Sequence, residues 1–362
     1  MQKPESDRIA SLDILRAFAI IAVILIHTIS GGLYNIAWSS VSFKIYIALD
    51  QFSRFSVPLF VFLSGYTLTL RYKDRGIAVS EFIRRRLLRL LPWYFFWSVV
   101  VFFYIRFSVY GQNAPYFPLW KILFLGKADY HLYFVPMIFS LYIIFPLLIW
   151  LVRKFPKTAL AMAFFWQAGF YLVLSKFSLG EIKLPIFLND QQQYLFFGTW
   201  LFYFVLGVYL AVEVKITMLI KKYFLPIFVL AFLGLVWECV NSLDLALTLS
   251  NLTVATRSTR FAVLAFATLS ILTLMGAVDY FKFIPKRIHD GLVRLGQRSY
   301  VVYLAHTLVL RVFSTYIHPI SLTSTVMLFV LVLAVSDYLS KLVLSAAALT
   351  HSKILYRKTE EI

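Results

Sequence analysis

Long apolar runs follow one another along most of this chain, separated by short polar gaps. A helix that crosses a membrane needs about 20 consecutive, mostly apolar residues. Because lipid offers no partner to unpaired backbone groups, such runs are expected to form helices. The pattern predicts an all-α integral membrane protein, a bundle of about ten transmembrane helices, near residues 12–30, 45–70, 92–108, 132–150, 158–176, 194–212, 223–240, 258–278, 299–317 and 324–347.

The composition indicates that lipid, rather than water, surrounds much of the protein. Hydrophobic residues make up 61% of the chain and charged residues only 14%, whereas soluble domains are about half apolar and a quarter charged. The gaps between the runs are too short for a separate soluble domain. We therefore expect one membrane-embedded domain over residues 1–362 with short cytosolic tails. We also expect the first run to be retained rather than cleaved as a signal peptide.

Basic residues set the expected orientation. The formal net charge is +18, but Lys and Arg gather in alternate gaps, such as 71–89 and 282–298. Cytosolic loops carry such an excess, so both termini are expected in the cytosol and nucleic-acid binding is not expected. Cys239 is the single cysteine, which excludes an intramolecular disulfide and a thiolate metal site. No Asp, Glu and His residues occur at ligand spacing, so no metal is expected.

The first apolar run contains three ionisable residues, Asp13, Arg16 and His27. Arg16 and His27 are separated by close to three helical turns, so they project from one face. Asp13 can pair with Arg16. If the helix begins near Leu12, His27 lies about 22 Å into it, toward the outer leaflet, while Arg16 lies at the cytosolic mouth. The segment fits both a functional stripe and a structural Asp–Arg pair with an interfacial histidine.

A second group of charges, Arg86 and Arg89, lies one turn apart just before an apolar run that opens at Pro92. Arginines in this position can simply anchor a helix and set its topology. They can also form a cytosolic phosphate site, because guanidinium groups match phosphate oxygens and stay charged. The residues alone leave both interpretations open.

Further polar side chains fall within or beside the predicted helices, where charge is costly and often functional. They are Arg54, His131, His306, Arg311 and Asp337. One such residue in a helix bundle is often a contact between helices. Several of them in different runs of one chain favour a functional site.

Together these residues resemble acyltransferase family 3, the integral membrane O-acyltransferases that modify cell-surface glycans and antibiotics. Leu12, Asp13, Leu15, Arg16, Ala17 and His27 are similar to its L-D-x-L-R-A…H signature, and Arg86, Arg89 and Pro92 to its R-x-x-R-x-x-P motif. SRFSVPLFVFLSGY, HLYFVPMIFSLYIIFPLL and SYVVYLAH also resemble the branch of surface-polysaccharide O-acetyltransferases. Many members end with Glu-x-Pro in the last helix, whereas only Asp337 lies nearby here.

The resemblance implies transfer of a short acyl group, expected to be acetyl, from cytosolic acyl-CoA to a hydroxyl of an extracytoplasmic or lipid-linked glycan. It implies catalysis by His27, Arg16 and Asp13, with His27 as general base or transient acyl acceptor. Donor binding is expected at Arg86, Arg89 and Arg54, and His131, Tyr303 and His306 are expected to line the active site. Acetyl-CoA is the expected donor substrate, with no metal. The expected location is a bacterial cell membrane, where the partners are the lipid bilayer and the glycan acceptor. Oligomeric state stays open.

Two other functions compete with this one. About ten helices with buried charges also suit an exporter of a polysaccharide or lipid-linked intermediate. Such an exporter would be expected to show an inverted repeat or matched broken helices, and we find neither in the sequence. A purely structural membrane subunit is the third possibility, and substitution of His27 would then have no effect on activity.

Overall fold

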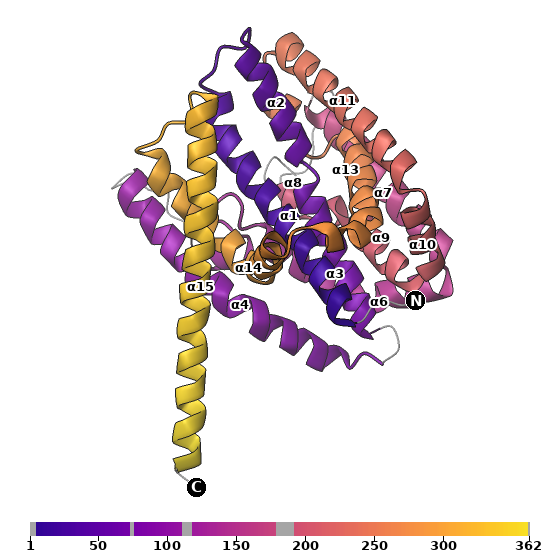
Figure 1. Ribbon diagram of the computed structural model, residues 1–362, viewed down its shortest axis with the longest axis vertical. Helices are drawn as coiled ribbons and strands as arrows, with labels where there is room; N and C mark the ends of the chain where they lie inside the picture. The colour runs from indigo at the N-terminus through magenta and orange to yellow at the C-terminus, as the bar shows by residue number, and fades with distance from the viewer. Residues whose placement is uncertain (1–4, 73–75, 111–117, 179–191, 361–362) are drawn as a thin grey trace.

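A computed structural model describes residues 5–72, 76–110, 118–178 and 192–360. These residues form helices joined by short connections, with no β-strand among them, as the apolar runs predicted (Figure 1). The helices are α1 (Glu5–Leu33), α2 (Val41–Ser53), α3 (Ser56–Tyr72), α4 (Val79–Tyr104), the π-helix η1 (Ile105–Tyr110), α5 (Leu119–Phe124), α6 (Phe134–Lys154), α7 (Pro156–Ser178), α8 (Gln192–Leu195), η4 (Phe197–Thr199), α9 (Leu201–Val212), α10 (Val214–Lys222), α11 (Phe224–Leu249), α12 (Leu252–Ala255), α13 (Phe261–Ala277), η5 (Val278–Phe283), α14 (Lys286–Ser314) and α15 (Leu322–Glu360).

Most of the predicted membrane helices are present. Within the described residues, eight helices are long and apolar enough to cross a membrane, and α9 with α10, which meet at a bend of 97°, can form a ninth. The chain is therefore a multi-pass membrane protein. The predicted run 299–317 falls in the C-terminal half of α14, whose N-terminal half is basic and lowers the average hydropathy. The number of ten crossings stays a prediction.

The short helix α9 packs inside the protein instead of facing lipid. It has 12 residues, about 18 Å of helix, and every residue from Phe202 to Ala211 is buried. A span that contacts only protein need not match the thickness of the hydrocarbon core. Its partner is α3: a Cβ on Gly65 would collide with the Phe204 carbonyl, and one on Gly207 with the Phe62 carbonyl. The two glycines therefore permit this close crossing.

The second predicted run is broken into two helices. Residues 45–70 were expected as one long helix with a kink at Pro58, but α2 ends at Ser53 and α3 begins at Ser56. Proline has no N–H to bond the carbonyl four residues earlier and its ring clashes with that carbonyl. For Pro58 that carbonyl belongs to Arg54. The break therefore places Arg54 at a corner between two helices.

Helix α1 lies between the two main hydrophobic clusters of the bundle. Ile14 and Leu15 belong to the cluster that includes α3, α6, α9 and α13, and Ile20 and Val23 to the one that includes α14 and α15. At Gly296 of α14, a Cβ would collide with the backbone of α1. Asp13 of α1 is 4% exposed and faces protein, which lowers the cost of burying its charge.

Asp337 is part of an ion pair between the last two helices. Arg298 of α14 donates hydrogen bonds of 2.7 and 2.8 Å from its Nη2 to the two carboxylate oxygens of Asp337 in α15. A doubly bonded pair of this kind fixes the register of two helices. The ion pair explains why a carboxylate, Asp337, lies within the last helix.

Candidate active site

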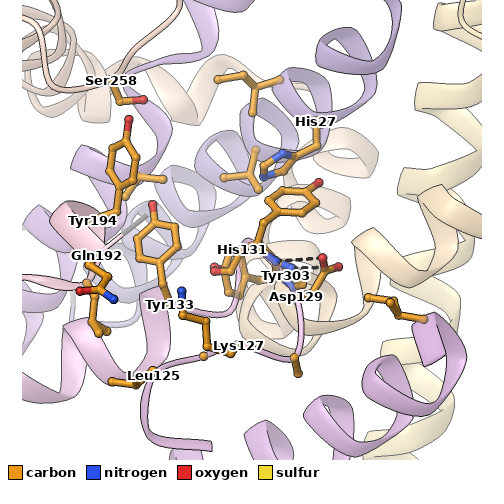
Figure 2. Close-up of a pocket in the computed structure, with 18 of the residues that line it drawn as sticks. His27, Leu125, Lys127, Asp129, His131, Tyr133, Gln192, Tyr194, Ser258 and Tyr303 are labelled. Carbon is orange, nitrogen blue, oxygen red and sulfur yellow. Dashed lines mark hydrogen bonds and ion pairs between the residues drawn. The ribbon is translucent and has the colours of Figure 1, made fainter. Parts of the chain in front are cut away.

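A cavity of about 640 Å³ opens where the C-terminal half of α1 meets the α2–α3 corner, the end of α4 with η1, and α14. Its floor is the loop 125–133 between α5 and α6. His27, His131 and Tyr303 gather on one side, with Tyr133, Tyr194 and Gln192 opposite (Figure 2). Four cations also line it: Arg54, Arg106, Lys127 and Arg311. The only carboxylate of the described lining is Asp129.

His27 presents its ring to this cavity from α1. Its ring centre lies 5.1 Å from that of Tyr130 and 5.3 Å from that of His306. Tyr130 meets it edge-on, with an angle of 64° between the planes. His27 is separated from Arg16 by about 16 Å along the helix. The predicted stripe therefore runs from one end of α1 to a cavity near the other.

Three histidines that are far apart in the sequence meet at the cavity wall. His306 of α14 is fully buried, and its ring centre lies 5.0 Å from that of His131. His306 Nδ1 lies 2.5 Å from the Tyr303 carbonyl oxygen. His27 and His131 line the cavity, whereas His306 is not among the lining residues. The predicted site residues His27, His131, Tyr303 and His306 are thus brought together.

One face of α14 holds the cavity floor. Tyr303, Thr307 and Arg311 follow one another at one-turn spacing. The Tyr303 hydroxyl donates to the His131 carbonyl, and the Thr307 hydroxyl lies 3.2 Å from His131 Nδ1. Arg311 donates from Nη2 to Asp129 at 2.6 Å. At Gly126 the chain adopts φ +64°, a conformation that favours glycine and lets the loop turn beneath the cavity.

The floor carboxylate is held in its charged form. Burial by itself raises the pKa of Asp129, but hydrogen bonds and positive charge from His131 and Arg311 outweigh burial and leave that pKa well below its usual range. His131 Nδ1 lies 3.6 Å from the carboxylate. Asp129 is therefore an anchor for His131 and Arg311 rather than a proton donor at neutral pH.

Arg54 is fixed on the cavity wall by a buried partner. It bonds both oxygens of the fully buried Asp50 at 2.7 to 2.9 Å, and its Nη1 donates to Ser258 at 2.8 Å. Arg54 precedes α3, whereas Arg71 lies in its last turn, about 25 Å further along. The structure thus does not bring Arg54 to Arg86 and Arg89, with which the sequence had grouped it.

Arg86 and Arg89 belong to a cluster at the other end of the bundle. Arg89 lies within electrostatic range of Arg16, Arg71 and Arg86, so three helices contribute to this arginine cluster. The Arg86 guanidinium lies 5.5 Å from the ring centre of Phe82 and 5.9 Å from that of Tyr142. Asp13 accepts a 2.5 Å hydrogen bond from Arg16.

The sequence did not point to several residues of the cavity and of the arginine cluster. Asp129 and Tyr130 directly precede His131, and Thr307 directly follows His306, yet none stood out because each lies in ordinary loop or helix sequence. Arg71 was counted only as a topological charge. Its position at the end of a predicted helix, like that of Arg86, was the available signal. Over the described part of the chain, no group of three or more His, Cys, Asp or Glu side chains could hold a metal ion.

Comparisons with known proteins show which family the sequence matches. The family model of acyltransferase family 3, an acyltransferase domain, matches residues 9–341. Among curated proteins, the O-acetyltransferases OatA of Staphylococcus aureus strains NCTC 8325 / PS 47 and COL are 27% identical to this chain over 229 residues, 55% of this chain. The match spans only 33% of the length of those relatives. No solved structure matches significantly.

The family match includes α1 with Asp13, Arg16 and His27, the Arg86–Arg89 pair of α4, and the SYVVYLAH segment of α14. These are the segments that supply the arginine cluster and the histidines of the cavity. The sequence resemblance is confirmed, and the chain belongs to acyltransferase family 3.

Proposed function

We propose that this acyltransferase moves an acetyl group from acetyl-CoA to a hydroxyl of an extracytoplasmic glycan or lipid-linked sugar in a bacterial cell membrane. The name of the relatives, O-acetyltransferase, supports the transferred group and the acceptor atom. The observation that carries the proposal is that α1 joins the arginine cluster at one end to His27 in a cavity toward the other. In this proposal one membrane domain performs the transfer, with both termini and the arginine cluster on the cytosolic side.

The donor end rests on several guanidinium groups. Arg16, Arg71, Arg86 and Arg89 converge from α1, α3 and α4. The phosphates of CoA are the anionic part of the donor, and arginine binds phosphate oxygens in pairs. In the described structure Arg86 Nε is buried without a hydrogen-bond partner. An incoming phosphate oxygen would satisfy this atom. Asp13 orients Arg16 through their hydrogen bond.

The acyl group must then travel along α1. The cavity wall reaches Val23, Ile26 and His27 on this helix. Val23 lies about two turns, or 10 Å, beyond Arg16. The thin pantetheine arm of CoA is the part of the donor that can cross this interval between packed helices. The thioester carbon would arrive beside His27.

His27 supplies the base for the transfer. It takes the proton of the acceptor hydroxyl as the hydroxyl oxygen attacks the thioester carbonyl, and it returns that proton to the sulfur as the C–S bond breaks. A two-step route, in which the His27 ring first accepts the acyl group, yields the same ester and thiol. Arg54, whose charge acts on His27, is the cation we assign to the developing oxyanion.

The opposite side of the cavity suits a sugar acceptor. Tyr133, Tyr194 and Gln192 offer aromatic faces and polar groups across from His27 (Figure 2). Aromatic rings and a few polar side chains are typical of sites that orient small polar ligands. Acceptor hydroxyls would bind here, on the side of the membrane away from the donor.

The test is thiol release from acetyl-CoA by the purified protein in nanodiscs. His27→Ala should lower acyl transfer at least about 100-fold, because a positioned general base contributes at least that factor. His318→Ala, which removes an exposed histidine outside the cavity lining, is the matched control and should keep full activity. Normal turnover by His27→Ala would refute the role of His27. Folded wild-type protein that neither binds nor consumes acetyl-CoA would favour the exporter function.

The donor site has its own test. Arg89→Lys keeps the charge but loses paired hydrogen bonding, so KM for acetyl-CoA should rise about tenfold, the equivalent of one charge-assisted hydrogen bond. Arg85→Lys is the control one turn earlier on α4, where Arg85 is exposed and pairs with Glu81. Equal KM values for Arg89→Lys and wild type would leave Arg89 as a topological anchor only.

A further inference from the structure

His306 is a buried base that the transfer mechanism above does not use. It lies in the interior of α14 with no exposed surface. Its Nε2 atom is buried and has no hydrogen-bond partner among the described residues. A buried polar atom without a partner costs free energy, on the order of 1–3 kcal/mol. An unpaired ring nitrogen next to a catalytic histidine therefore calls for a functional explanation.

The tautomer of His306 follows from its other nitrogen. Nδ1 lies 2.5 Å from the Tyr303 carbonyl oxygen, which can only accept a hydrogen bond. Nδ1 must then carry the proton. In the neutral ring, Nε2 is left with a lone pair and acts as an acceptor.

Two rings of the cavity lining lie close to His306, those of His131 and His27. We consider His27 first, because it is the proposed base. The ring centres of His27 and His306 are 5.3 Å apart and the planes are tilted by 32°. That spacing accommodates one hydrogen bond between two ring edges once His27 turns slightly about its side chain. In this structure the His27 ring makes no hydrogen bond to any described residue, so its N–H has no competing protein partner.

We infer that His306 is a positioning residue, whose Nε2 accepts the N–H of His27 and so directs the other His27 nitrogen into the cavity as the base. This inference rests on the proposed function for its consequence, the rate of acyl transfer. The arrangement resembles in logic the carboxylate that fixes the tautomer of a catalytic histidine, with a neutral imidazole as the acceptor. A neutral acceptor avoids burying another charge in the bundle.

Other groups also face His27 and must be distinguished from His306. On the floor loop, the Tyr130 ring contacts His27 and the His131 ring contacts His306. Asp129 and Arg54 act on His27 through their charges. Each ring nitrogen of His131 already has a polar neighbour: Asp129 and the Thr307 hydroxyl lie 3.6 and 3.2 Å from Nδ1, and the same hydroxyl lies 3.4 Å from Nε2. His306 is thus the neighbouring ring with an unoccupied acceptor.

The direct test is the tautomer of His27, read by nitrogen NMR of histidine-labelled protein in nanodiscs. The chain has 6 histidines, and the spectrum of His27→Gln identifies the signal of His27. Wild-type protein should show one His27 tautomer. His306→Leu should give a mixture of both, whereas His306→Gln, which places an amide oxygen near the position of Nε2, should restore one tautomer in part. Val302→Ala, a fully buried packing change one turn earlier on α14, should leave the signal unchanged.

Activity gives the second readout. His306→Leu should lower the acyl-transfer rate about tenfold or more, because His27 would lose part of the rate factor that a positioned base contributes. The KM for acetyl-CoA should not change. His306→Gln should recover part of that loss. A single unchanged His27 tautomer in folded His306→Leu protein would overturn the inference. The absence of acetyl-CoA turnover in wild type would instead refute the proposed function, while the tautomer spectrum would still test the contact.

Discussion

The cavity floor depends on two residues with unequal burial. The Asp129 side chain is 2% exposed, whereas that of Arg311 keeps 31% of its surface. Arg311→Gln should therefore destabilise the protein more than Asp129→Asn, because it leaves a buried carboxylate without its partner. We expect Arg311→Gln to lower the free energy of unfolding by about 1–3 kcal/mol. This is less than the loss of a fully buried pair would cost, because solvent reaches Arg311. Thermal unfolding in detergent measures it, and equal costs for both variants would contradict the asymmetry.

Asp129 also makes the stability of the protein depend on pH. Burial raises the pKa of Asp129, but His131 and Arg311 more than reverse this, so the folded-state pKa lies below the unfolded value. Such a carboxyl contributes stability above its unfolded pKa and loses it only as pH falls through the folded pKa. Without Arg311, burial is opposed by His131 alone, so the pKa of Asp129 rises. The stability gap between wild type and Arg311→Gln should therefore narrow as pH falls toward that raised pKa. A constant gap would show that the carboxylate is not the cause.

At the scale of elements, the crossing of α3 and α9 determines whether the short helix α9 can stay buried. Gly65→Ala would force the added methyl group onto the Phe204 carbonyl, so we expect a cost of about 1–3 kcal/mol from overpacking. Gly169 of α7 is the control, because a Cβ there meets no atom within 4 Å. Gly169→Ala should change stability by less than about 1 kcal/mol. If both variants unfold alike, close glycine packing does not hold α9 in place.

Local sequence patterns predicted the helices better than their breaks and ends. The apolar runs located the membrane helices because lipid demands them. The position of Pro58 implied a disturbed helix, yet the break at Arg54 follows only when the carbonyl four residues earlier is considered. For α14, hydropathy captured the apolar half and missed the extension to Lys286. That half is held by protein contacts such as Gly296 against α1, which a sequence window does not contain.

The site was predictable only where its residues follow a periodic pattern. His27 and Arg16 share a face of one helix, and their separation follows from helical geometry. By contrast, Asp129 meets Arg311 across a sequence separation of 182 residues. Arg54 was grouped with the donor arginines because depth in the membrane cannot be deduced from residue type. Tertiary packing, not local preference, decides which of these charges meet.

At the scale of the whole molecule, the loops between helices lie at two ends of the bundle, and side-chain contacts show which loops share an end. Arg153 donates to the Tyr72 carbonyl at 3.0 Å and Lys221 pairs with Asp279 at 2.9 Å, both at the end of the arginine cluster. At the cavity end, Tyr46 donates to the Ser321 carbonyl at 3.0 Å, alongside the contacts of Arg54 with Ser258 and Arg311 with Asp129. If the two ends face opposite sides of the membrane, the connections alternate as the basic residues predict. The number of crossings, with α9 as one of them, stays a prediction.

Cysteine labelling of spheroplasts tests that topology. Single cysteines are introduced into a Cys239→Ser background. An impermeant thiol reagent should label Ser39→Cys, Ser250→Cys and His318→Cys without permeabilisation. Ser80→Cys and Lys222→Cys should react only after the membrane is permeabilised. All five positions are exposed in the folded chain, so differences in labelling report the side of the membrane. If α9 does not complete a crossing, Lys222 will label together with Ser39, and Ser250 will become protected. That outcome would move the cavity contacts of Ser258 to the cytosolic side, which is incompatible with a cavity that His27 shares with an outer acceptor.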